Sequence, residues 1–280
     1  MTTRDHSLSA KLLLYILLCA GAIAMITPFI WMLLTAFKTQ ETLYLIPPQI
    51  WPDPATTDNF VFVWEKMNFV RYTLNSIFVV VLDITGQVLA CSVVAYGFAM
   101  FDFRGKNILF MLVLATMMMP SQVTMIPEYF IWSKLNLLDT YAPMIIPSFF
   151  GKAFGIFLMR QNFRSLPFSF YESARIDGAN PFTILMKIYL PISVPVIWTV
   201  VILAFIGSWN NTLGPLLYLK TPDNYTLPLA MLRLNDTTQA MTNVAIKMAG
   251  AAIVMAPTIL VFLFAQKHFV KGVASSGVKG

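Results

Sequence analysis

Long stretches without a charged side chain alternate with short polar segments along the whole chain. A helix that crosses a bilayer needs about 20 apolar residues, because the hydrocarbon core is about 30 Å thick and each residue rises about 1.5 Å. Six stretches approach or exceed that length, and two of them contain an ionisable residue, Asp83 and Lys152 respectively. The pattern predicts an all-α integral membrane protein, a single domain over 1–280, with six transmembrane helices at approximately 12–37, 74–101, 107–130, 142–160, 191–214 and 245–266.

The composition supports this class of protein. Only 11% of the 280 residues are charged, against about 25% in soluble proteins, and 58% are hydrophobic. So few charges cannot cover a water-soluble surface, and disordered chains lack such apolar content. The net charge of +6 does not indicate nucleic acid, because the basic residues gather on one side of the membrane: eleven lie in the inner segments and six in the outer ones. Since positive residues stay in the cytoplasm, both termini are predicted to be cytoplasmic.

The predicted cytoplasmic loop at 161–190 is far longer than the roughly 2 to 8 residues that a connection between packed helices needs. Ser169 and Glu172 have the spacing of a capping box, which predicts a helix that starts near Phe170. Gly178 should end this helix, because glycine tolerates the left-handed conformation. The Asn-Pro pair that follows should begin a second helix. The loop is therefore predicted to be two short helices joined at a glycine elbow.

The same loop carries a longer motif, Glu172-Ser173-Ala174-Arg175-Ile176-Asp177-Gly178, nine residues, and then Ile188-Tyr189-Leu190-Pro191. It resembles the EAA loop of ATP-binding-cassette (ABC) importer permeases, written E-A-A, three residues, G, nine residues, I-x-L-P. Ser173 is the one departure, and serine is small enough to preserve a close contact. The resemblance implies that this helix docks on a separate cytoplasmic ATPase and transmits its closure to the membrane helices. The implied coupling residues are Glu172, Ser173, Ala174, Arg175, Ile176, Asp177, Gly178 and Ala179.

The resemblance extends over nearly the whole chain and is closest to the carbohydrate branch, in particular to the smaller permease of maltose-type importers. Residues 95–99, Met119-Pro120, Trp209-Asn210 and 272–280 carry it. It implies a type I ABC importer permease fold in a bacterial inner membrane. The implied partners are a second homologous permease, forming a heterodimer, two copies of the ATPase and an extracytoplasmic sugar-binding protein. ATP and Mg would bind the ATPase, and this chain would hold no cofactor and no metal. The implied ATPase-contacting tail is Gly277, Val278, Lys279 and Gly280.

Ionisable residues inside a membrane span indicate function or pairing, because a lone charge in the bilayer is costly. Asp83 and Lys152 lie at similar depth, roughly 14 to 15 Å below the outer surface. We expect them either to pair between helices or to line the translocation path. Gln87, Trp209 and Asn210 are expected to face the same polar interior, although a tryptophan near a span end is also typical of an interfacial anchor.

The expected function is ATP-driven import of a sugar or sugar derivative, with an oligosaccharide as the first candidate. Two alternatives remain open. An ion-coupled secondary transporter would use Asp83 and Lys152 in a relay and would need no ATPase, whereas a related ABC importer would carry glycerol phosphate or another non-sugar solute. An enzyme is not indicated, because the sequence has no catalytic residue set. His6 and His268 lie at opposite ends of the chain, without companion metal ligands.

Overall fold

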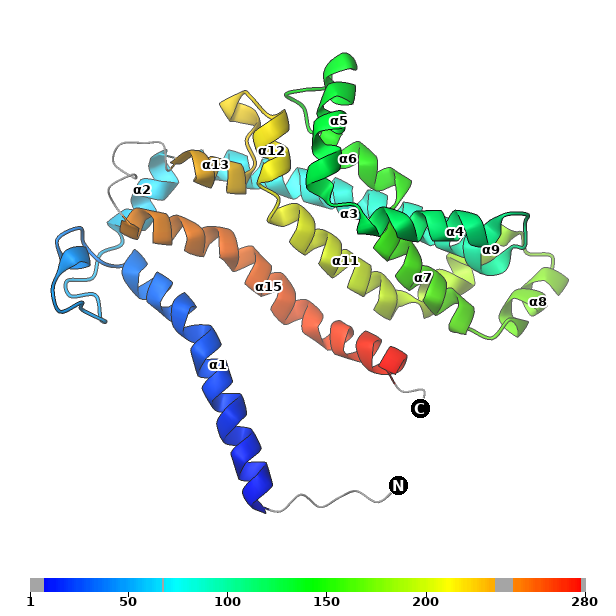
Figure 1. Cartoon of the computed structure of the whole chain (residues 1–280), viewed down its shortest axis with the longest axis horizontal. Coiled ribbons are helices and arrows are strands. Elements are labelled where there is room, and N and C mark those ends of the chain that lie inside the picture. The colour runs from blue at the N-terminus through cyan, green and yellow to red at the C-terminus, as the bar shows by residue number, and fades with distance from the viewer. Residues whose placement is uncertain (1–7, 67, 235–243, 278–280) are drawn as a thin grey trace. The chain divides into compact units, whose positions relative to one another are not determined.

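The structure of the chain is a computed structural model (Figure 1). It describes the backbone of residues 8–66, 68–234 and 244–277, and side chains within these ranges from Lys11 to Phe264. This part of the chain is helical, and its one β contact is an isolated bridge between Lys38 and Ala55. The expected all-α class is thereby confirmed.

The helices are numbered along the chain as in Figure 1. Those up to the middle of the chain are α1 (Leu8–Ala36), η1 (Thr42–Tyr44), α2 (Asp58–Lys66), α3 (Phe69–Met100), α4 (Lys106–Ala115), η2 (Thr116–Met118), α5 (Ser121–Lys134), α6 (Ala142–Ile145) and η3 (Ile146–Phe150). They are followed by α7 (Ala153–Ser165), α8 (Ser169–Ile176), α9 (Pro181–Ile184), the π-helical turn η4 (Leu185–Tyr189), α10 (Leu190–Ile192), α11 (Val194–Trp209), α12 (Leu213–Tyr218), η5 (Pro222–Asn224), α13 (Leu227–Leu234) and α15 (Val244–Gly277).

The chain divides into two compact units. The first consists of Met1–Phe69 with Arg233–Ala256, and the second of Val70–Leu232 with Pro257–Gly280. In the first unit, the buried Asn59 at the start of α2 donates from its side-chain amide to the carbonyls of Ala36 and Lys38, both at 2.8 Å. These bonds satisfy backbone groups at the end of α1 and hold α2 against it.

Four helical segments in the described ranges are long and apolar enough to cross a membrane, and the number rises to six if two bent pairs are each counted as one span. The four are Lys11–Ala36, Phe69–Met100, Ala142–Ser165 and Val244–Phe264. The bent pairs are Lys106–Met118 with Ser121–Lys134, at 100°, and Pro181–Ile192 with Val194–Trp209, at 82°. The protein is thus multi-pass, and the third and fifth expected spans fall in bent segments.

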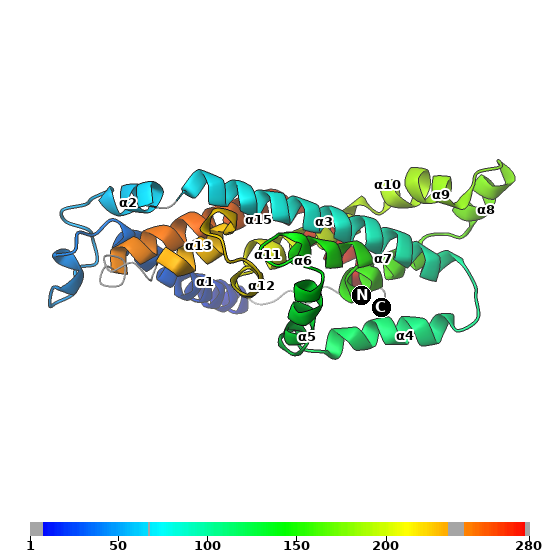
Figure 2. The same ribbon diagram turned by 90° about the horizontal axis from the view of Figure 1, so that it is seen from above.

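The break in the expected span at 107–130 lies at Met119-Pro120. Proline has no N–H to continue the helical ladder, and its ring disfavours a helical conformation in the preceding residue. Met119 accordingly has extended dihedral angles (φ −82°, ψ 122°), and α5 restarts after Pro120. Figures 1 and 2 show α5 turned sharply away from α4 at this point. The two half-spans are therefore not one straight helix.

In the second unit, α3 and α7 pack closely because glycine lies at their contact. A Cβ atom on Gly155 would come within 2.7 Å of the Cys91 sulfur. Gly86 has a similar role opposite η3, where an added Cβ would lie 2.3 Å from the Ser148 hydroxyl oxygen. The core between these helices includes Met159 and Val200. The close approach brings the polar residues of α3 and the start of α7 together.

Candidate functional site

The helix α8, in the loop between α7 and α11, begins one residue earlier than the capping box predicts. Its first residue is Ser169, its N-cap is Phe168, and no side chain caps it. The Phe168 carbonyl accepts hydrogen bonds from the N–H groups of Tyr171 (2.9 Å) and Glu172 (3.2 Å), while Phe170 donates to Pro167. The prediction of a capping box is therefore wrong, because backbone carbonyls accept the N–H groups of the first turn that the Ser169 side chain would have capped.

The end of α8 is the predicted glycine elbow. Gly178 has φ +80°, the left-handed region in which a side chain is strained. Its N–H donates to Arg175 at 3.1 Å, and the N–H of Ala179 donates to Ala174 at 2.9 Å. This pair of bonds is the Schellman arrangement that closes a helix. The prediction of a glycine stop is confirmed.

The second helix also begins as predicted. The Asn180 side-chain oxygen accepts the N–H of Thr183 at 2.8 Å, and Pro181 occupies the first helical position. The helical path then continues through the π-helical turn η4 and α10 to Ile192, two residues beyond the predicted end of the loop at residue 190. The loop thus consists of a helix, a glycine elbow and a second helix.

Most of the motif residues are exposed on α8. Ile176 is 86% exposed, and Glu172, Ser173, Arg175, Asp177 and Gly178 are also exposed, while Ala179 is half-buried. Ala174 differs, because its side chain is buried in the core of the second unit and serves packing within this chain. The loop presents a strongly exposed isoleucine between a basic and an acidic side chain, which is a combination suited to a protein contact.

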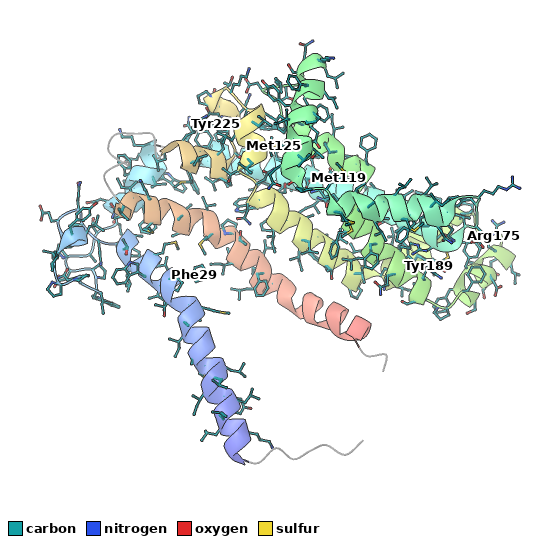
Figure 3. The ribbon with its side chains drawn as sticks, in the orientation of Figure 1. Phe29, Met119, Met125, Arg175, Tyr189 and Tyr225 are labelled. Carbon is teal, nitrogen blue, oxygen red and sulfur yellow. The ribbon has the colours of Figure 1, made fainter. Side chains whose placement is uncertain are left out.

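Three aromatic rings connect this loop to the membrane helices, a feature that the sequence did not reveal. Tyr96 of α3, Phe163 of α7 and Tyr189 of η4 pack edge to face, with ring centroids 5.3 to 6.2 Å apart. All three are at most 4% exposed and share one core with Ala174. Figure 3 shows Tyr189 and Arg175 at the same end of this unit. We call the three rings the aromatic joint.

The predicted intramembrane pair is present. The Lys152 Nζ lies 3.9 Å from the Asp83 carboxylate, and the Gln87 side-chain amide donates to the same carboxylate at 2.7 Å. Ser208 of α11 lies close to the same carboxylate. The Asp83 side chain is 5% exposed, whereas that of Lys152 is 58% exposed. The Asp83 carboxylate is thus buried among polar groups, and the lysine that pairs with it remains accessible.

The other two predicted path residues lie at the end of α11 but differ in exposure. Trp209 is 3% exposed and stacks on Phe205, with ring centroids 5.7 Å apart. Asn210 is exposed, and its amide donates to the Ile206 carbonyl at 2.9 Å. In this conformation the indole packs within the protein and is not available to stack on a sugar. Of the predicted tail, Gly277 ends α15, and Val278, Lys279 and Gly280 lie outside the described residues.

A polar clamp at the opposite end of α3 was not predicted. Asp139, in the loop after α5, accepts the backbone N–H groups of Lys220 (2.8 Å) and Thr221 (2.9 Å). The Thr221 hydroxyl above all, and then these N–H groups, lower the pKa of Asp139 to about 2. The adjoining Asp223 forms an ion pair with Arg71 at 3.1 Å. These contacts join two loops that are 82 residues apart, so no pattern of neighbouring residues in the sequence predicts them.

Residues 87–275, which include α8 and the aromatic joint, match the family model described as "Binding-protein-dependent transport system inner membrane component". The arabinooligosaccharides transport system permease protein AraQ of Halalkalibacterium halodurans is 34% identical over 230 residues, 82% of this chain and 81% of that protein. AraQ of Bacillus subtilis is 32% identical and covers 90% of both chains. The diacetylchitobiose uptake system permease protein NgcG of Streptomyces coelicolor is 28% identical over 93% of this chain and 86% of its own length.

A solved structure has the same fold. It is described as a bacterial ABC transporter involved in the import of the acidic polysaccharide alginate, and one of its chains matches with a TM-score of 0.80 at 26% identity, over 95% of this chain and 100% of that chain. The helical fold, the loop geometry and these matches favour a transporter that depends on a binding protein, and they leave the ion-coupled alternative without support. The chain therefore belongs to the family of binding-protein-dependent transport system inner membrane components and is a permease subunit of an ABC importer, not an enzyme.

Proposed function

We propose that this permease carries an oligosaccharide across the inner membrane of a bacterium, after delivery by an extracytoplasmic binding protein. The named relatives transport arabinooligosaccharides and diacetylchitobiose, and the structural relative takes part in alginate import. These names favour a sugar polymer over glycerol phosphate or another non-sugar solute. We further propose that a second homologous permease and two copies of an ATPase complete the complex, with ATP and Mg bound to the ATPase.

The observation that carries the coupling proposal is the exposed helix α8 with its buried Ala174. Ile176 and the charged residues beside it face outward, while Ala174 holds the helix to the core that contains the aromatic joint. A partner that grips the exposed face of α8 would therefore displace α3 and α7 together. ATP-driven closure of the ATPase pair would reach the membrane helices by this route and open the path outward.

We propose six spans, with the third bent at Met119-Pro120 and the fifth beginning at the turn at Ser193, and with both termini in the cytoplasm. Two features of α3 support this topology. The aromatic joint packs on α3 at Tyr96, near its end, while Asn75, near its start, donates to the carbonyls of Asp223 and Tyr225, both at 2.9 Å. The coupling loop and the polar clamp thus lie at opposite ends of one membrane-length helix. The sections 161–190 and 267–280 would be the cytoplasmic coupling loop and tail, and Gly277 to Gly280 would contact the ATPase.

We assign the polar group around Asp83 to the translocation path. The accessible Lys152 ammonium and the exposed Asn210 offer hydrogen-bond donors of the kind that sugar hydroxyls need. Gln87 orients the buried carboxylate beneath the lysine. Trp209 would contribute only after a movement of α11, since its indole is packed on Phe205 in this conformation.

The decisive experiment is native mass spectrometry of the complex purified through a tag on this chain. We expect a particle with a second permease and two ATPase copies. In the variant Ile176→Asp, which places a charge on the exposed face of α8, the ATPase copies should be lost. Ser165→Asp adds the same charge to an exposed site before α8 and is the matched control. Equal ATPase retention in both variants would contradict docking through α8.

A further inference from the structure

A basic pocket lies where α3 ends, α4 begins and α7 makes its last turns. Its volume is about 650 Å³, and it is lined by three cationic side chains, Lys106, Arg160 and Arg164, and by one anionic side chain, Asp102. Lys106 pairs with Asp102 at 2.9 Å, and this carboxylate is fully exposed. The pocket therefore has an excess of positive charge that its own acidic residue does not neutralise.

The two arginines are arranged to receive an anion. They are one turn apart on α7, where like charges repel each other. Within the ranges that the structure describes, neither guanidinium has a carboxylate within 4 Å, and the three ion pairs found there involve other cations. Arg160 is held in place, because it lies 3.9 Å from the centre of the Phe110 ring and donates from Nε to the Phe98 carbonyl at 3.3 Å. Its other donors are left for a ligand.

The pocket lies at the ends of two candidate membrane spans, where lipid headgroups are expected. The helices α3 and α7 belong to candidate membrane spans, and the pocket lies where both spans end. In its lining, Phe103 and Ile108 are 43% and 61% exposed. Leu112, one turn further along α4, is 59% exposed, so apolar side chains continue from the pocket along this helix. No side chain caps the first turn of α4, which adds the positive end of a helix dipole.

We propose that this pocket binds the phosphate of an anionic phospholipid, whose acyl chains lie along the exposed apolar face of α4. Basic pockets between transmembrane helices recognise such headgroups, and the arginine fork matches phosphate oxygens. The lipid would neutralise the repulsion between Arg160 and Arg164 and fasten α4 to α7 beside the aromatic joint. The inference rests on the membrane placement of α3 and α7 and not on the identity of the transported solute.

The test uses the complete importer complex, purified through a tag on this chain from a membrane that contains phosphatidylglycerol. Native mass spectrometry reports the subunits and the retained lipid in one spectrum, so failure of assembly is distinguished from loss of lipid. We expect one phosphatidylglycerol to be retained by the native complex. Arg164→Gln, at an exposed side chain, should weaken retention by about tenfold or more. Lys187→Gln removes one positive charge from an exposed site outside the pocket and should leave lipid retention unchanged.

A thermal-stability series on the same complex identifies the source of the phosphate. Nanodiscs of phosphatidylglycerol should raise Tm above that in phosphatidylcholine, and Arg164→Gln should abolish the difference. Three results would overturn the proposal. Millimolar inorganic phosphate could give the same rise in phosphatidylcholine, which would indicate a free ion as ligand. Lys187→Gln could lose lipid equally, which would indicate general surface charge. Arg164→Gln could release the ATPase with lipid retained, which would make the pocket a protein interface.

Discussion

The glycine elbow of α8 offers a sharp test of coupling, because conformational strain and docking predict opposite orders of two substitutions. Gly178 has φ +80°, and a Cβ atom added there would meet no heavy atom of this chain within 4 Å. Any defect of Gly178→Ala or Gly178→Asn therefore arises from backbone strain or from a partner that occupies the open space. The two causes can be separated by the choice of side chain.

Strain should penalise alanine more than asparagine. A left-handed conformation costs an ordinary L-residue roughly 1–2 kcal/mol, whereas asparagine adopts it several-fold more readily. For Gly178→Ala this corresponds to about a 5- to 30-fold fall in the population of the native elbow. Gly105 has φ +82° and open space around its added Cβ, and it lines the basic pocket, so Gly105→Ala measured in phosphatidylcholine nanodiscs gives a comparison for this strain in thermal stability.

Docking should penalise asparagine more than alanine, because the larger side chain blocks closer approach of the ATPase. We expect this second order. The assay is uptake of substrate per ATP hydrolysed in proteoliposomes that contain the complex and its binding protein. Gly178→Asn should lower this ratio more than Gly178→Ala, although Gly178→Ala should lose more thermal stability through strain. A ratio for Gly178→Asn above that of Gly178→Ala would refute docking at the elbow and leave glycine with a purely conformational role.

Three further predictions concern packing, the intramembrane pair and the outer clamp. Gly155→Ala places a new Cβ 2.7 Å from the Cys91 sulfur and should destabilise the permease by about 1–3 kcal/mol. Adding Cys91→Ala removes that sulfur and leaves the Cys91 Cβ, 3.5 Å away, as the nearest atom of that residue, so most of the lost Tm should be recovered. No recovery would contradict the α3–α7 contact. Lys152→Gln should destabilise the permease more than Asp83→Asn, by about 1–3 kcal/mol, because it leaves a buried carboxylate unpaired rather than an accessible ammonium, and the Tm of the double variant should resemble that of Asp83→Asn; equal single effects would contradict this asymmetry. Asp139 has a pKa lowered from 3.8 to about 2, so its stabilising effect is complete above pH 3.8 and is lost as the pH falls towards 2. The Tm difference between the native protein and Asp139→Asn should accordingly be constant above that pH and shrink below it, and a difference that grows in acid would refute the clamp.

The sequence by itself determined the features that depend on neighbouring residues. The all-α membrane class follows from the length of apolar stretches, and the glycine elbow and Asn180 cap follow from groups at most five positions apart. The pairing of Asp83 with Lys152 could be predicted because the depth of a residue in a bilayer follows from its position along a span, and these two positions have equal depth. The capping box failed although it is local, because the Phe168 carbonyl already satisfied the amides that Ser169 would have capped.

The tertiary structure decided how these elements meet. The aromatic joint unites residues 96, 163 and 189, and its rings come together only when α3, α7 and η4 pack. The clamp joins Asp139 to Thr221, and the basic pocket brings Lys106 beside Arg160, across separations that no helical period encodes. Residues within a turn meet whatever the rest of the chain does, whereas distant residues meet only in the folded arrangement that buries them together.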